Sequence, residues 1–182
     1  MLQLIVFLLG SFGFLILSFR SISHPVSHGF PRFFAFEAIL GLVVLNAPVW
    51  FVHPFSPAQI LSWALLLGAV LLAIHAIWAL RKYGKPDQSV QDSRRLSFEK
   101  TTRLVTEGPY KYIRHPMYAS LLLFAWGVFL KQISLSSALL LVLISLALYI
   151  TAFFEERENL SLFGDVYNQY MRLTKRFIPF VF

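Results

Sequence analysis

The residues of this chain that could do chemistry lie mostly in its second half, and the first of them form a basic segment. Residues 108–118 have the sequence GPYKYIRHPMY, with Arg114 and His115 directly before Pro116. Proline suits the first position of a helix, where the free backbone amides of the first turn carry partial positive charge. The segment therefore predicts an anion site at a helix start. The alternative is a basic segment beside a membrane, with aromatic anchors at the headgroups.

A pair of carboxylates, Glu155 and Glu156, follows 22 residues that contain no charge. If a helix ends there, the pair opposes the helix dipole and costs stability. A functional interpretation is that the pair holds an ammonium or a sulfonium, or acts as a base. The alternative is that the helix continues into the cytoplasm and that Arg157, Arg172 or Lys175 neutralises the pair.

Two ionisable residues, Glu37 and His75, lie inside apolar segments. Such groups are functional candidates by default, and we take both as candidates for the substrate side of a site. The alternatives are that Glu37 pairs with Arg32 or is protonated in lipid, and that His75 hydrogen-bonds a neighbouring helix. Glu37 lies near the start of its segment and His75 near the end of its own, and by helical rise each is roughly 6 to 8 Å from the cytoplasmic end of the span that it belongs to. The sequence therefore predicts one depth, and one site, for both residues together with His115 and the Glu155-Glu156 pair.

Metal and nucleic-acid sites are not expected. His24 and His28 have the spacing of a helical metal pair, but Pro25 lies between them and the sequence around them offers no further ligand. Cysteine is absent, which excludes disulfides and thiolate ligands. The net charge of +7 arises from basic residues in loops between apolar segments, where membrane orientation explains them better than nucleic acid does.

The elements that must position these residues are apolar helices. The chain is 57% hydrophobic and 14% charged, which predicts an all-α integral membrane protein of one domain, residues 1–182. A helix needs about 20 residues to cross a hydrocarbon layer of ~30 Å. Five transmembrane helices are expected, the fourth of them short and the first a retained helix rather than a signal peptide. They are residues 2–19, 33–52, 59–80, 117–130 and 133–154.

The basic residues predict the orientation of these helices. Five spans place all but one of the 16 lysines and arginines on one side, and Lys131 alone on the other. The positive-inside rule then puts the amino terminus outside and the carboxyl terminus in the cytoplasm, and we expect the plasma (inner) membrane. A polar loop, residues 81–115, and the tail from Glu155 onward face the cytoplasm. Three- and four-residue spacing in the tail predicts an amphipathic helix against the membrane or the loop, through Leu160, Phe163, Tyr167, Tyr170 and Leu173.

Residues 104–182 resemble the membrane methyltransferases that include isoprenylcysteine carboxyl methyltransferase and the phospholipid N-methyltransferases. The resemblance lies in several motifs in a specific order: LVTEGPY at residues 104–110, RHPMY at 114–118, Glu155-Glu156, Phe163-Gly164, Tyr167, Tyr170 and RFIP at 176–179. This chain has Ala119-Ser120 where many relatives have a glycine after the tyrosine, and it is far shorter than the eukaryotic prenylcysteine enzymes.

The resemblance implies five spans and S-adenosylmethionine as cofactor, bound at the cytoplasmic face within residues 104–182. It implies methyl transfer to a lipophilic or membrane-accessible carboxylate, amine or thiol, such as a lipid. The residues assigned to the cofactor are Gly108, Tyr110, His115, Pro116, Tyr118, Glu155, Glu156, Tyr167 and, on the third span, Gly68. Those assigned to catalysis are Arg114, His115 and Glu156. We further expect Arg114 and the helix start to hold a carboxylate, and the glutamates to hold amino or ribose groups.

Two other functions share some of these features. Membrane sterol reductases that use NADPH carry a similar Arg-His-Pro-x-Tyr segment, but they usually follow it with Gly-Glu rather than Ala119-Ser120. A non-catalytic membrane protein with the same fold is the second alternative, and the presence of every ionisable motif residue argues against it. The sequence does not predict an oligomeric state.

Overall fold

The computed structural model describes residues 1–22, 27–84 and 103–181, and this part of the chain is helical. The elements are α1 (Leu2–Ile22), α2 (Gly29–Asn46), η1 (Ala47–Val49), α3 (Pro57–Tyr83), η2 (Gly108–Lys111), α4 (Pro116–Phe129), α5 (Leu135–Phe163) and α6 (Asp165–Leu173). Among the described residues no strand occurs, and one isolated bridge joins Ile113 to Lys175. His24 and most of the polar loop, residues 85–102, lie outside the described part.

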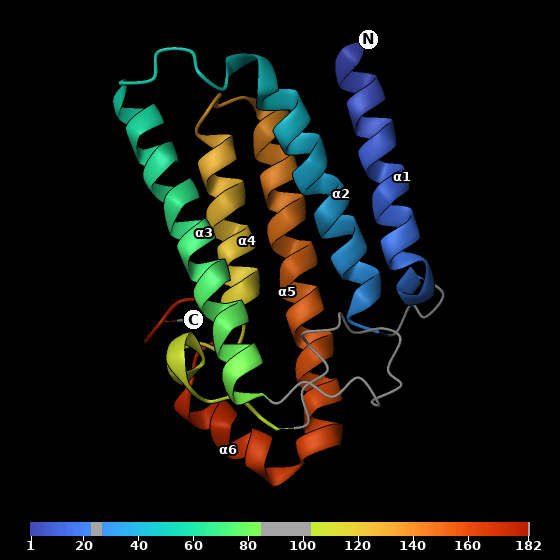
Figure 1. Ribbon diagram of the computed structural model, residues 1–182, viewed down its shortest axis with the longest axis vertical. Helices are drawn as coiled ribbons and strands as arrows, with labels where there is room; N and C mark the ends of the chain where they lie inside the picture. Colours follow the sequence, from blue (N-terminus) through green and yellow to red (C-terminus); the bar gives the residue numbers. More distant parts are fainter. Residues whose placement is uncertain (23–26, 85–102, 182) are drawn as a thin grey trace.

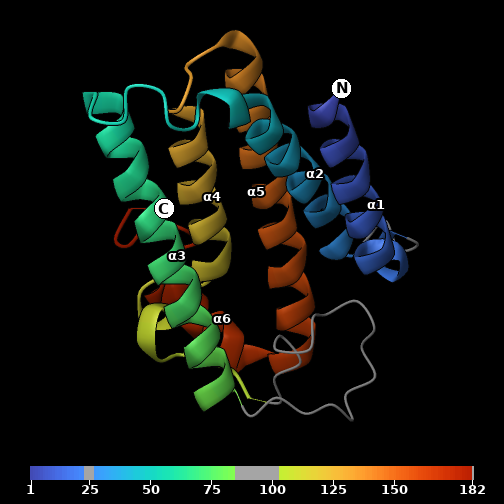
Figure 2. The same ribbon diagram turned by 45° about the horizontal axis from the view of Figure 1, so that its top comes forward.

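The five longest helices run alternately up and down beside one another (Figures 1 and 2). The start of α1 lies at the end of the bundle opposite α6 (Figure 1). Four helices, α1, α2, α3 and α5, are long and apolar enough to cross a membrane. Helix α4 has 14 residues, or about 21 Å at ~1.5 Å per residue, which is less than a hydrocarbon layer. The short fourth element is thus confirmed, and a count of five spans stays a prediction.

Several of the expected boundaries were wrong. Helix α1 ends at Ile22 rather than at residue 19, and α2 begins at Gly29 rather than at residue 33. Helix α2 ends at Asn46 rather than at residue 52, because Pro48 has no amide hydrogen to continue the helix and the chain changes to the 3-10 turn η1. Helix α3 runs on to Tyr83. Helix α5 runs nine residues beyond the expected end at 154. The overhang of α5, residues 155–163, is what carries Glu155 and Glu156.

Close packing between α3 and α4 depends on a small residue. A Cβ on Gly127 would lie 2.9 Å from Leu66 Cγ and 3.2 Å from the Leu66 backbone nitrogen, so no larger side chain fits there without a shift. The Ser62 hydroxyl donates to the Gly127 carbonyl at 2.6 Å. Small residues and hydroxyl bonds are the usual means by which helices associate in lipid, where burial of apolar surface offers little gain.

A buried lysine and a buried glutamine lie at the end of the bundle away from α6. Lys131, in the turn between α4 and α5, is 6% exposed, and its Nζ donates to Gln59 Oε1 at 3.0 Å. The Gln59 amide donates back to the Lys131 carbonyl at 3.2 Å. Lys131 Nζ also lies 3.3 Å from the centre of the Trp63 ring, as a cation–π contact. These three residues, the Lys131 cluster, join α3 to the α4–α5 turn.

The tail is two helices rather than one, because the chain turns at Gly164. The φ angle of Gly164 is +55°, a left-handed conformation that glycine adopts at little cost. Leu160 and Phe163 therefore belong to α5, while Tyr167 and Tyr170 lie on α6. Both tyrosines are buried, whereas Leu173 is 84% exposed. Tyr170 donates to the Tyr110 carbonyl at 2.6 Å, so α6 packs against the η2 segment, which is one of the two expected partners.

Candidate active site

Glu156 is the centre of a buried ion cluster at the α6 end of the bundle. Its side chain is 5% exposed. The carboxylate accepts hydrogen bonds from Arg114 Nε at 2.8 Å and from Arg176 Nη2 at 2.5 Å. His115 Nε2 lies 3.2 Å from the same carboxylate. The hydrogen bond to Glu156 raises the pKa of Arg176, which keeps that guanidinium charged. Three segments far apart in sequence are thereby joined by charge-assisted hydrogen bonds.

The sequence suggested that the two carboxylates lie at a helix end, and the structure shows that they do not. Because α5 continues to Phe163, the helix dipole does not oppose them, and the alternative of a helix that continues beyond the apolar span is confirmed. The neutralising cations were predicted wrongly for Glu156. They are Arg114 and Arg176, not Arg157, Arg172 or Lys175, because the tail folds back across the end of the bundle.

The backbone places the tail beside the basic segment. The Arg114 amide donates to the Lys175 carbonyl at 2.8 Å, and the His115 amide donates to the Arg176 carbonyl at 3.1 Å. The Arg114 guanidinium also donates to the carbonyls of Met171 and Thr174. Much of the donor capacity of Arg114 is therefore directed at the protein itself.

His115 is fixed by its neighbours and precedes α4. As expected, α4 begins at Pro116, and His115 is the capping residue. The His115 ring is 4% exposed and stacks on Tyr118, with 5.5 Å between ring centres. The Phe177 ring lies tilted against His115, with 6.1 Å between ring centres. The Tyr118 hydroxyl donates to Glu155 Oε2 at 2.6 Å, so the two adjacent glutamates have different partners.

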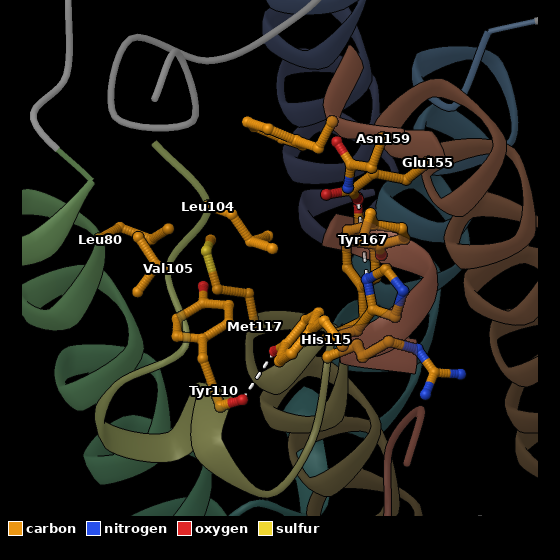
Figure 3. Close-up of a pocket in the computed structure, with 13 residues that line it drawn as sticks. Leu80, Leu104, Val105, Tyr110, His115, Met117, Glu155, Asn159 and Tyr167 are labelled. Carbon is orange, nitrogen blue, oxygen red and sulfur yellow. Dashed lines mark hydrogen bonds and ion pairs between the residues drawn. The ribbon is translucent and has the colours of Figure 1, made fainter. Parts of the chain in front are cut away.

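A cavity lies next to this cluster and encloses about 650 Å³ of empty space, including space open to solvent. Apolar side chains of α3, the 104–105 segment and α4 line one side, and Glu155, Asn159, Tyr167 and His115 face them (Figure 3). The lining residues are Leu80, Leu104, Val105, Tyr110, Arg114, His115, Met117, Tyr118, Glu155, Asn159, Phe163, Tyr167 and Tyr170. The cavity thus combines a carboxylate, cations and an apolar wall.

Four tyrosines contribute to this lining: Tyr110, Tyr118, Tyr167 and Tyr170. Burial raises the pKa of Tyr167 and of Tyr170 above the ordinary value of a phenol. Both phenols are therefore neutral at physiological pH and can donate hydrogen bonds. Their ring faces carry the negative part of the aromatic quadrupole, so they attract a cationic ligand.

The structure brings six of the predicted site residues to the cavity wall: Tyr110, Arg114, His115, Tyr118, Glu155 and Tyr167. Three others lie beside it. Pro116 starts α4, Glu156 lies within the ion cluster, and Gly108 supports the η2 turn with φ +62°. A Cβ on Gly108 would lie 3.3 Å from His75 Nε2, so this glycine lets η2 approach α3.

The structure does not bring Glu37, His75 or Gly68 to the cavity wall. Glu37 Oε2 accepts a hydrogen bond from Ser11 of α1 at 2.6 Å, on the other side of the bundle from η2. His75 lies on α3 between Gly108 and Trp78. Gly68 is in the middle of α3, with open space where its Cβ would be. A common depth was predicted correctly for His115 and the glutamates, but helical rise does not report which way a helix face points.

Asn159 and Leu80 line the cavity and were not predicted. Asn159 follows Glu155 by four residues, and Phe163 follows by four more, so one face of α5 carries all three. That spacing was visible in the sequence, but its use required knowing that α5 continues past the apolar span.

His28, one of the two histidines considered for metal, has a different partner. Its ring Nδ1 lies 2.7 Å from Glu158 Oε2, and its backbone amide donates to Glu158 Oε1 at 3.1 Å. The start of α2 is thereby tied to the α5 overhang, close to Asn159 in sequence.

The family of the chain follows from this fold and from sequence comparison. The described residues form a helical bundle, and four of its helices are long and apolar enough to cross a membrane, which indicates an integral membrane protein. Residues 57–169 match the model of the phospholipid methyltransferase family, which is more than half of the chain, and the chain belongs to this family. The match runs from the start of α3 into α6, and it includes Arg114, His115, Glu155 and Glu156.

One similar protein is the protein-S-isoprenylcysteine O-methyltransferase of Schizosaccharomyces pombe. The two are 36% identical over 84 residues, which is 43% of this chain and 34% of that enzyme. The chain thus matches about a third of the length of this relative.

Proposed function

We propose that this protein transfers a methyl group from S-adenosylmethionine to a lipophilic acceptor at the cytoplasmic face of the plasma (inner) membrane. The observation that carries the proposal is the cavity beside the Glu156 ion cluster, where a carboxylate, cations and four tyrosine rings line one space. Membership of the phospholipid methyltransferase family gives that cavity a reaction class.

The cavity suits the chemistry of this methyl donor. S-adenosylmethionine combines an ammonium, a carboxylate and a sulfonium with a flat base. Glu155 and Asn159 offer acceptors for ammonium or ribose hydroxyl groups, and the tyrosine faces suit a sulfonium. Leu104, Val105 and Met117 offer an apolar surface for the base (Figure 3). The first-turn amides of α4 are the group best able to meet the carboxylate, since Arg114 is largely engaged by the protein.

When bound, S-adenosylmethionine supplies an electrophilic methyl group on a sulfonium centre. The chain must then align the reactants and exclude water, which for well-oriented reactants is worth on the order of 7 to 11 kcal/mol at best. His115 contributes to such alignment, because its ring stacks on Tyr118, contacts Phe177 and lies within hydrogen-bond distance of Glu156. The Glu156 cluster holds that arrangement together.

The acceptor atom decides whether the chain must also supply a base. A carboxylate acceptor needs none, whereas an amine or thiol must lose a proton. Glu156 is engaged by two guanidinium groups and does not line the cavity, so we assign it to positioning rather than to proton transfer. Glu155, with a side chain 28% exposed, and His115 Nδ1 at 3.9 Å from it, are the groups placed to accept a proton.

An apolar groove beside the site supports a lipophilic acceptor. It encloses about 1080 Å³ of empty space, including space open to its surroundings, and its lining is almost entirely apolar. It lies between α3, α4 and the carboxyl-terminal segment, with Leu72, Leu122, Trp126 and Phe177 among its walls. Phe177 contacts the groove on one side and His115 on the other. A hydrocarbon chain in this groove would end beside the His115 ring.

The orientation belongs to the same proposal. We take α4 as a fifth, shortened span, which puts the amino terminus outside and the cavity in the cytoplasm. The start of α1 and helix α6, whose Tyr167 and Tyr170 line the cavity, lie at opposite ends of the bundle, as this requires (Figure 1). Arg81 and Lys82 at the last turn of α3 lie on the cavity side, in agreement with the positive-inside rule.

Titration of the detergent-purified protein with labelled S-adenosylmethionine tests the proposal. His115→Ala and Glu155→Gln should each weaken binding about tenfold or more, because each removes a group of the cavity wall. Glu37→Gln is the matched control, since it neutralises a carboxylate that faces α1, and it should leave the affinity unchanged. Equal affinities in all four proteins would refute the assignment of the cavity.

A second assay tests the reaction itself. Labelled S-adenosylmethionine is incubated with the protein and a whole-membrane lipid extract, and the labelled product is identified. Binding of NADPH in place of S-adenosylmethionine would support a reductase instead. Tight binding of the methyl donor with no labelled product from a broad acceptor panel would indicate a non-catalytic protein of this family.

A further inference from the structure

A second polar cavity lies at the α6 end of α3, behind one wall of the methyl-donor cavity. It encloses about 550 Å³ of empty space, including space open to solvent. Its polar lining comes from two cations, two hydroxyl groups and one carboxylate: Lys82, Arg103, Tyr83, Thr106 and Glu107. We call it the Lys82 cavity. None of these residues has a part in the proposed binding of the methyl donor or in methyl transfer.

The two cations of the Lys82 cavity are available to a ligand. Neither Lys82 nor Arg103 has a carboxylate within 4 Å in the described structure. Both residues are exposed. Lys82 Nζ instead lies 4.6 Å from the Trp78 ring centre and 5.2 Å from that of Tyr83. These rings hold the ammonium in place by cation–π contact and leave its protons free to donate.

The position of the cavity indicates which anion it meets. Helix α3 is long and apolar enough to cross a membrane, and Lys82 lies in its last turn. Trp78, 47% exposed, and Tyr83 have the position typical of aromatic anchors at the headgroup layer. The anion that is concentrated at that depth is the lipid phosphate.

We propose that the Lys82 cavity binds the phosphate of a bilayer lipid, with Lys82 and Arg103 as charge partners and Thr106 as a hydroxyl donor. Glu107 opposes an anion, so the cavity carries a single net positive charge. That balance favours reversible binding of one phosphodiester over permanent capture. The site is separate from the cavity assigned to the methyl donor.

The two cavities share a wall. Leu104 and Val105 line both, and they belong to a segment without regular secondary structure. Arg103 and Thr106 flank Leu104 and Val105 in sequence. A phosphate held by both would therefore fix the shared segment at its two ends. Lipid binding should therefore tighten the binding of S-adenosylmethionine, through the ordering of one shared element. This coupling rests on the proposed function, whereas the lipid site does not.

Binding of a short-chain phosphatidylglycerol to the detergent-purified protein tests the lipid site without any methyl donor. Lys82→Gln and Arg103→Gln should each weaken binding about fivefold, the usual effect of one basic side chain at a lipid surface. Glu107→Gln should strengthen it by a similar factor, because it removes the opposing charge. The control is Lys111→Gln, which removes an exposed cation from the same end of the protein but outside the cavity.

The outcomes separate the sources of the phosphate. Weaker binding in the two cation variants with unchanged binding in Lys111→Gln supports the site. Equal binding in all four variants overturns it. Inorganic phosphate at the same concentration should bind at least tenfold more weakly than the lipid, and a short-chain diacylglycerol without phosphate should not depend on Lys82. Inorganic phosphate binding as tightly as the lipid would contradict a lipid site.

Coupling is measured by titrating S-adenosylmethionine with and without the short-chain phosphatidylglycerol. At a lipid concentration near the wild-type Kd for the lipid, the lipid should tighten methyl-donor binding about threefold in the wild-type protein and clearly less in Lys82→Gln, which binds less of the lipid at that concentration. No effect in either protein overturns the coupling. If S-adenosylmethionine does not bind under any condition, the proposed function fails, while the lipid titration still decides the phosphate site.

Discussion

The bundle has a buried polar cluster at each end, and the two differ in what lies beside them. In the Lys131 cluster, Lys131 and Gln59 satisfy each other and Trp63 covers the ammonium. In the Glu156 cluster, Arg114, His115 and Arg176 converge on one carboxylate. Lysine and glutamate are both rarely buried in proteins, so each cluster is unusual by the same criterion.

The difference teaches that a buried charge is not by itself a sign of function. The Lys131 cluster is closed, since Lys131 and Gln59 bond each other and the Trp63 ring covers the ammonium. The Glu156 cluster borders a cavity, because its members Arg114 and His115 also line that cavity, opposite the apolar wall and beside Glu155 and Asn159 of α5 (Figure 3). The functional sign is the adjacent residue, Glu155, whose partner Tyr118 also lines that cavity.

Glu156→Gln should have the largest effect, because it leaves two guanidinium groups at a buried site without their charge partner. Removing one member of such a cluster costs about 3 kcal/mol or more. We expect a large loss of stability in thermal unfolding in detergent, together with loss of S-adenosylmethionine binding. The double variant Glu156→Gln, Arg176→Gln should recover part of the stability, because one unpaired charge is removed with its partner. A stable Glu156→Gln protein with unchanged donor affinity would break the comparison.

Lys131→Met should have a smaller effect, confined to stability. It removes the ammonium from Trp63 and leaves Gln59 Oε1 without its donor, which costs about 2 kcal/mol. Unfolding temperature should fall, while the affinity of the folded protein for S-adenosylmethionine stays at the wild-type value in calorimetric titration. A change in affinity comparable to that of Glu155→Gln would mean that the two ends of the bundle are coupled.

Tyr118→Phe should have the smallest effect on stability and a clear effect on binding. It deletes the hydroxyl that donates to Glu155 and keeps the ring stacked on His115. Loss of one such hydrogen bond is worth about 1 kcal/mol, or roughly a fivefold weaker affinity for S-adenosylmethionine. The matched control is Tyr112→Phe, since Tyr112 lies outside the donor cavity. Equal affinities in the two variants would show that Glu155 does not need Tyr118.

The sequence by itself determined the apolar helices, the short fourth helix, and the residue types of the site. A helix satisfies the backbone of a long uncharged segment in lipid within the segment itself, and Pro116 marks a helix start through its missing amide hydrogen. The motifs of residues 104–182 were equally local, and they predicted the family to which the chain belongs.

Tertiary structure alone decided which partners these residues have. Arg176 reaches Glu156 because Gly164 reverses the chain and the tail pairs with residues 112–115. Counting residues from the span ends predicts the depth of the site for Glu37 and His75, yet neither reaches the cavity wall. Glu37 accepts a hydrogen bond from Ser11 of α1 instead. Depth along a helix follows from counting residues, whereas the direction of a side chain follows from how whole helices pack. Packing of that kind depends on contacts such as Leu66 against Gly127, which are 61 residues apart in the chain.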